Sequence, residues 1–101
     1  MKRPKVFRLG ILKYKILWRP RLKDKEGSKV GGWHKQHKAH IEVNTKTDKN
    51  FQKLVLMHEI IHAICRSSGV SLKENKVDGI AIGMINAMRQ NEWMGRWWNK
   101  D

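Results

Sequence analysis

Residues 51–65 read FQKLVLMHEIIHAIC, and the apolar side chains of this run recur at the spacing of one helix face. Thr47 or Asp48 can serve as the N-cap, and Gly69 follows the last apolar position as a C-terminal stop. We therefore predict a helix from about Lys49 to Ser67.

This helix would contain the motif His58-Glu59-Ile60-Ile61-His62. Side chains at positions i and i+4 lie on one helix face, so the two imidazoles converge. Two histidines at this spacing can hold one zinc ion, with Glu59 placed as the general base that takes a proton from the attacking water. The sequence thus predicts His58 and His62 as zinc ligands and Glu59 as the catalytic residue. A pair of ordinary histidines is the alternative.

Glu74 and Asp78 are the next acidic residues, and they stand four positions apart on a second predicted helix, so both face one way. We assign Glu74 as the third ligand and Asp78 as the acceptor for the free N–H of a ligand histidine. An exchange of these two roles is the main alternative. Ser71-Leu72-Lys73-Glu74 also fits a capping box, in which Glu74 would reach back to the Ser71 backbone, and Asp78 would be an ordinary exposed residue.

The second helix should open at this capping box and fade near Gln90 to Glu92. Its apolar side would be formed by Val77, Ile80, Ala81, Met84, Ile85 and Met88. Gly79 and Gly83 lower its helix propensity, but we expect them to allow close packing against the first helix. We expect three tryptophans to close the small core, with stacking on bases as the alternative: Trp93, Trp97 and Trp98.

The first half of the chain has the pattern of short strands. Tyr14–Trp18 reads YKILW and predicts a strand that Pro20 ends. Arg21 to Gly32 is polar and charged, which indicates an exposed loop. Two further short strands are expected at Trp33–Gln36 and Ala39–Asn44. Strands followed by helices predict an α+β fold, with a small twisted antiparallel or mixed sheet and both helices on one face of it.

The 101 residues suit one domain, made of a basic strand-rich half (1–50) and a helical half (51–101). The net charge of +13 is uneven, because 15 Lys/Arg against 4 Asp/Glu give +11 up to Asn50 and 7 against 5 give +2 beyond it. This asymmetry favours a nucleic-acid or nucleoprotein partner, with a solvated basic surface as the alternative. A single cysteine, Cys65, and the lack of a membrane-spanning or secretory segment favour an intracellular, cytoplasmic protein.

The remaining candidate residues have simpler interpretations. His34, His37 and His40 cannot all meet easily without a turn, so a surface or hairpin role is favoured. The alternative is that one of them approaches the zinc as a ligand or as a donor that stabilises an oxyanion. Cys65 is interpreted as a small buried hydrophobe and not as a nucleophile or ligand.

From Leu54 to Ile64 the chain reads LVLMHEIIHAI, and from Glu74 to Ala81 it reads ENKVDGIA. These segments resemble minimal zincin-type metallopeptidases, in particular small phage and mobile-element proteins related to the ImmA/IrrE-type family. The resemblance implies a minimal zincin-like fold and a glutamate-zincin centre, with His58, His62 and Glu74 as zinc ligands and Glu59 as general base. It also implies that Asp78 orients a ligand histidine, and that a phage-encoded chain would act in the host cytoplasm. No third histidine follows closely, which excludes the metzincin arrangement.

Three functions follow as hypotheses. The first is a zinc-dependent metallopeptidase that acts on a protein or peptide substrate, with the strand Ala39–Val43 pairing with an extended substrate by edge addition. The second is a non-catalytic basic module on a zincin scaffold that binds nucleic acid or a host protein. The third is a metal-dependent hydrolase of another bond.

Overall fold

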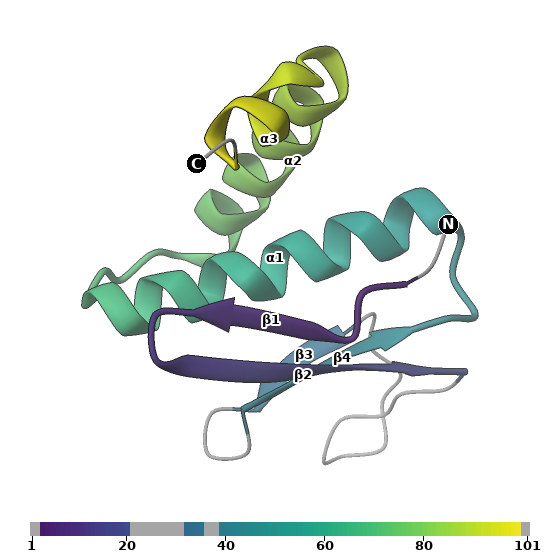
Figure 1. Cartoon of the computed structure of the whole chain (residues 1–101). Coiled ribbons are helices and arrows are strands. Elements are labelled where there is room, and N and C mark those ends of the chain that lie inside the picture. Colours follow the sequence, from purple (N-terminus) through teal and green to yellow (C-terminus); the bar gives the residue numbers. More distant parts are fainter. Residues whose placement is uncertain (1–2, 21–31, 36–38, 100–101) are drawn as a thin grey trace.

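The computed structural model describes residues 3–20, 32–35 and 39–99, and for residues 32–35 and Trp98 it describes the backbone only. The chain forms an α+β domain in which four strands precede three helices (Figure 1). The elements are β1 (Val6–Leu9), β2 (Leu12–Arg19), β3 (Gly32–Lys35), β4 (His40–Asn44), α1 (Lys49–Ser68), α2 (Glu74–Gln90) and α3 (Trp93–Trp98). The expected loop over residues 21–31 and the end of the expected strand at Gln36 lie outside the described residues.

The four strands form one mixed sheet in the order β1-β2-β4-β3. β2 pairs antiparallel with β1 and parallel with β4, and β4 pairs antiparallel with β3. The prediction of an antiparallel or mixed sheet is therefore confirmed as mixed. The prediction that Ala39–Val43 offers a free edge is wrong, because β4 lies between β2 and β3 and both of its sides are already paired.

β1 was not expected from the sequence. It joins β2 through a two-residue turn, since Leu9 pairs with Leu12 across Gly10 and Ile11. Gly10 has a φ of 60°, a left-handed conformation that glycine adopts at no steric cost. A Gly-X pair between two runs of β-forming residues is a hairpin signal, and it is the signal that would have predicted this strand.

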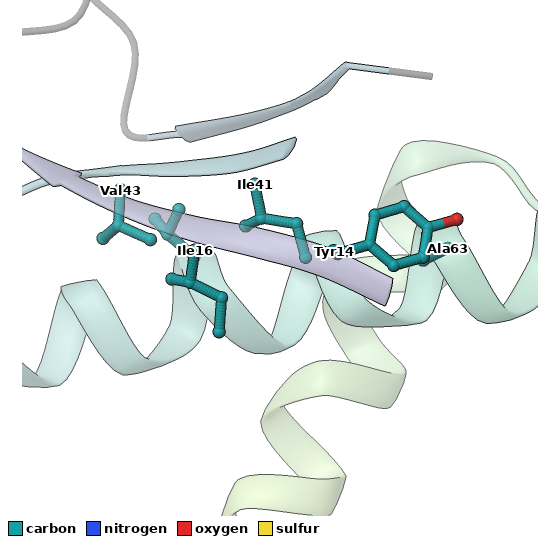
Figure 2. Packing of buried hydrophobic residues seen from close by; sticks show 6 residues of the cluster. Tyr14, Ile16, Ile41, Val43 and Ala63 are labelled. Carbon is teal, nitrogen blue, oxygen red and sulfur yellow. The ribbon is translucent and has the colours of Figure 1, made fainter. Parts of the chain in front are cut away.

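α1 lies across one face of the sheet and forms the main core with it (Figures 1 and 2). Alternate residues of β2 and β4 point toward the helix, so the buried side chains come from both layers. They are Tyr14, Ile16, Ile41, Val43, Val55 and Ala63.

Both predicted ends of α1 are confirmed. The Phe51 backbone N–H donates to the Asp48 carboxylate at 3.0 Å, which makes Asp48 the N-cap. Gly69 ends the helix at a φ of 69°, and the Val70 N–H then donates to the Cys65 carbonyl at 2.9 Å.

α2 packs against α1 and projects away from the sheet (Figure 1). The prediction that both helices lie on the sheet face is thus correct only for α1. The α1–α2 core is small: its buried residues are Ile61, Val77 and Ala81. The predicted close packing at Gly79 and Gly83 is wrong, because a Cβ at either position would meet no atom within 4 Å.

Two further predictions for this region are wrong. The capping box does not form, since α2 begins at Glu74 with Lys73 as an N-cap that makes no side-chain hydrogen bond. The tryptophans do not close the core: Trp93 and Trp97 are 51% and 65% exposed, because α2 carries α3 beyond the packed layers. The side chain of Trp98 lies outside what the structure describes. No helix in the described ranges combines the length and apolar character needed to cross a membrane.

Candidate metal centre

The third and fourth turns of α1 bring His58 and His62 together. Their Nε2 atoms lie 3.0 Å apart and their ring centroids 4.6 Å apart. The side chains are 14% and 25% exposed, so both rings are held by the surrounding protein while their edges reach solvent. This is the convergence that the i, i+4 spacing predicts.

The first two turns of α2 place two carboxylates against these rings. Glu74 bridges the pair, with Oε2 at 2.9 Å from His58 Nε2 and Oε1 at 2.7 Å from His62 Nε2. Asp78 lies one turn later and approaches the other side of His58, with Oδ1 at 2.6 Å from Nδ1. Both carboxylates are more than half exposed, so they lie on the side of the histidine pair that faces solvent.

The hydrogen-bond partners of the two rings show what this cluster requires. Asp78 accepts a hydrogen bond from His58, so the proton of a neutral ring sits on Nδ1 and Nε2 keeps its lone pair. That lone pair faces a Glu74 oxygen and the Nε2 of His62 at 3.0 Å or less. Two acceptor atoms this close need a hydrogen atom or a cation between them. The Nε2–H tautomer of His62 can supply one such hydrogen, and a metal ion bound between the two rings and Glu74 would satisfy all three atoms.

The donor atoms fit a metal ion. His58, His62 and Glu74 each offer one ligand atom, and these atoms lie within 4.8 Å of one another. Ligands bound tetrahedrally at about 2.0–2.1 Å stand roughly 3.3 Å apart, so the cluster would open by only a few tenths of an ångström. Two imidazoles and one carboxylate with a free fourth position are a donor set typical of catalytic zinc.

Glu59 lies beside this cluster on α1 and is buried, with 6% of the residue exposed. Burial raises the pKa of its carboxyl from 4.5 to about 7; the nearby His58 lowers this pKa and Glu74 raises it. A carboxyl with a pKa near neutrality can both accept and return a proton at physiological pH, which is the property that a general base needs.

A cleft of about 400 Å³ runs between α1 and α2 at this position. Its polar lining is His58, Glu59, Glu74 and Asp78, and its apolar lining is Phe51, Leu54, Val55 and Ile82. Ile82 was not expected at the site. Its position four residues after Asp78 is the sequence signal that places it on the same helix face.

Of the other candidate residues, His40 and Cys65 do not join the cluster in the described part of the chain. His40 begins β4 and is half-buried, His34 is described only as backbone in β3, and His37 lies outside the described residues. Cys65 is half-buried and packs against the α1–α2 core, away from the lining of the cleft. This placement agrees with a packing role, although the side chain is less buried than expected.

Comparison with known proteins found no matching family model, no matching curated protein and no matching solved structure. The candidate centre is therefore interpreted from its own geometry.

Proposed function

We propose that this chain is a zinc-dependent metallopeptidase. The observation that supports it most is the convergence of His58, His62 and Glu74 on one point within hydrogen-bond distance of each other. Glu59, buried beside that point, supplies the acid–base group that peptide hydrolysis requires.

In this proposal, His58, His62 and Glu74 hold the metal. When bound there, zinc would polarise a scissile carbonyl and make a water molecule more acidic. Asp78 keeps the Nδ1 proton of His58 in place, so that the Nε2 lone pair points toward the cleft.

Glu59 would move the proton. Its carboxylate takes one from the attacking water and later returns it to the leaving amine. In the metal-free protein, burial raises the pKa of this carboxyl to about 7, so it holds a proton more readily than an ordinary carboxylate does, which favours the return of the proton.

The apolar lining favours a peptide as substrate. Phe51, Leu54 and Ile82 form a wall beside the candidate metal ligands. An apolar side chain next to the scissile bond would be buried against this wall, while the open side of the cleft leaves room for the backbone to pass.

The experiment compares zinc content and peptide hydrolysis for the wild type, Glu59→Gln and Glu92→Gln. Glu92 is an exposed carboxylate that lies beyond the end of α2, at the N-cap of α3, and its substitution changes the charge equally. We expect all three proteins to bind zinc and only Glu59→Gln to lose activity, by about 10²–10⁴-fold. Equal hydrolysis by all three would reject the role of Glu59. Hydrolysis of esters but not of peptides, with the same dependence on Glu59, would point to the other hydrolase class.

A non-catalytic basic module remains the second candidate, and the exposed cations of the N-terminal strands favour it. This candidate predicts a protein that binds a polyanion and hydrolyses no peptide, whether or not it binds zinc. That result would contradict the metallopeptidase proposal.

A further inference from the structure

The β1–β2 hairpin carries positive charge on the sheet face that points away from α1. The register pairs Arg8 with Lys13 and Val6 with Lys15, and side chains of directly paired residues share one face of a strand pair. On the opposite face Phe7 pairs with Tyr14, and both belong to the core under α1. Arg8, Lys13 and Lys15 are all exposed, and we name these three residues the hairpin basic patch.

The charges of this patch are not balanced by the described part of the protein. Like charges directly opposite each other on adjacent strands repel, because their Cβ atoms are only about 5 Å apart. Arg19, further along β2, meets Glu42 at 3.0 Å, but no acidic residue in the described ranges forms an ion pair with a member of the patch. An anionic ligand would relieve this repulsion.

The shape of the hairpin narrows the choice of anion. β4 pairs with β2 only from Lys15 onward, so among the described strands the first three residues of β2 pair with β1 alone. The hairpin therefore ends in a two-stranded ribbon, and Ile11 at its tip is fully exposed. A two-stranded ribbon fits the major groove of B-form DNA, about 12 Å wide, whereas the major groove of duplex RNA is too narrow for side-chain contact.

We infer that the hairpin basic patch binds double-stranded DNA, with its three cations on the phosphate backbone and the tip of the ribbon in the major groove. The strand register places this patch on the sheet face opposite to the one that α1 covers (Figure 1). Bound DNA would therefore leave the His58–His62 cleft open. The inference goes beyond the proposed peptidase activity and does not depend on it. It also gives a role to the excess of positive charge in residues 1–50.

The test uses the full chain and a short mixed-sequence DNA duplex, with affinity measured by fluorescence anisotropy at several salt concentrations. One variant carries Arg8→Gln, Lys13→Gln and Lys15→Gln. The matched control carries Lys46→Gln, Lys53→Gln and Lys76→Gln, three exposed cations outside the hairpin. Both variants lower the net charge from +13 to +10, so a general charge effect would change both equally.

We expect wild-type affinity to fall steeply with salt. Each phosphate contact contributes about 0.9 to the logarithmic salt slope, so the hairpin variant should lose about 2–3 of that slope and at least about tenfold in affinity. The control should change by less than about threefold. Circular dichroism checks that both variants fold, and the single substitution Lys13→Gln, expected to remove about 1 from the slope, provides a milder version of the test.

Three results would overturn the inference. An equal loss in both triple variants would show that only net charge matters. Wild-type binding that is undetectable or insensitive to salt would exclude phosphate contacts. Tighter binding to duplex RNA or to anionic phospholipid vesicles than to DNA would assign the patch to another partner. None of these results bears on zinc content or peptide hydrolysis.

Discussion

Glu74 and Asp78 share the two nitrogens of His58 between them. Glu74 lies at Nε2, the atom that also faces His62, while Asp78 lies at Nδ1. Only a group on the Nε2 side can share an ion with both imidazoles. The two carboxylates, although one helical turn apart, therefore have different consequences when removed.

We expect Glu74→Ala to abolish stoichiometric zinc binding, because it removes a ligand. Asp78→Ala should instead weaken the affinity by about 10–100-fold, the usual effect of losing the partner that orients a ligand histidine. Zinc titration against a competing chelator measures both. If Asp78→Ala removed the zinc while Glu74→Ala kept it, the two roles would have to be exchanged.

Glu59 is expected to reduce the stability of the metal-free protein above neutral pH. Its pKa of about 7 in the folded state exceeds the ordinary 4.5, so the folded state binds the proton more tightly. The stabilisation from this proton is fully present below pH 4.5 and is lost as the pH rises through 7. A shift of this size corresponds to about 3 kcal/mol.

The measurement is urea denaturation of the wild type and Glu59→Gln in the presence of a chelator. Glutamine does not titrate, and the other groups of the two proteins are identical. The free energy of unfolding of the wild type relative to the variant should therefore fall between pH 4.5 and pH 8. Parallel pH profiles for the two proteins would contradict the raised pKa.

The partners of a site residue could be predicted where the helical spacing alone determined them. They could not be predicted where two possible partners competed for the same side chain. The i, i+4 spacing of His58 and His62 brings their rings together in any helix. For Glu74, the sequence also offered the Ser71 backbone as a partner. The structure places its carboxylate at two imidazoles, which offer two contacts where the capping box offers one. The residues around Glu74 do not reveal where α1 lies in the folded chain. The sequence could therefore not decide whether Glu74 contacts the Ser71 backbone or the two imidazoles.

At the scale of elements, α2 is the most weakly held of the long helices. Its buried residues are Val77 and Ala81, both in its first half, and beyond them Ile82, Met84 and Met88 are 41–50% exposed. Arg89 donates to Asn50 Oδ1 at 2.9 Å and so provides one tie from the far end back to α1. The stability of α2 should therefore depend on helix propensity more than that of α1 does.

Gly79→Ala and Gly83→Ala should each stabilise the protein by about 0.5–1 kcal/mol. Alanine favours the helix, and its Cβ would meet no neighbour at either position. Gly69→Ala is the control, because its left-handed φ of 69° makes alanine unfavourable there by about 1 kcal/mol. The free energy of unfolding, measured by urea denaturation, should rise for the two α2 variants and fall for the control. Destabilisation by either α2 substitution would show that the glycines have a packing role after all.

A helix or strand could be predicted when the residues that determine it lie close together in the sequence. Both ends of α1 are marked by local chemistry, at Asp48 and Gly69, so a short window suffices to find them. The position of α2 depends on contacts between distant segments, which is why close glycine packing and buried tryptophans were expected and not found. β1 has only four residues and was detectable only through the turn at Gly10.

At the scale of the whole molecule, two separate apolar clusters among the described residues share α1. One joins α1 to the sheet and the other joins it to α2, and the second has only three buried residues. A chain of 101 residues buries a modest core in total. The candidate metal ligands span the weaker of the two contacts, since His58 and His62 belong to α1 and Glu74 belongs to α2.

Zinc should therefore stabilise the fold by joining α2 to α1. A ligand that binds only the folded state at about 100 times its Kd adds about 2.7 kcal/mol. For a domain of this length that corresponds to a rise in Tm of roughly 10–20 °C. Thermal unfolding followed by circular dichroism, with zinc and with a chelator, measures this shift.

Two variants show where the stabilisation arises. The double substitution His58→Ala and His62→Ala should remove the zinc-dependent rise in Tm, because it deletes both imidazole ligands. Cys65→Ser should keep it, because the thiol lies in the α1–α2 core and outside the cleft. A rise that survives loss of both histidines would mean that the metal binds elsewhere and does not join α2 to α1 through these ligands.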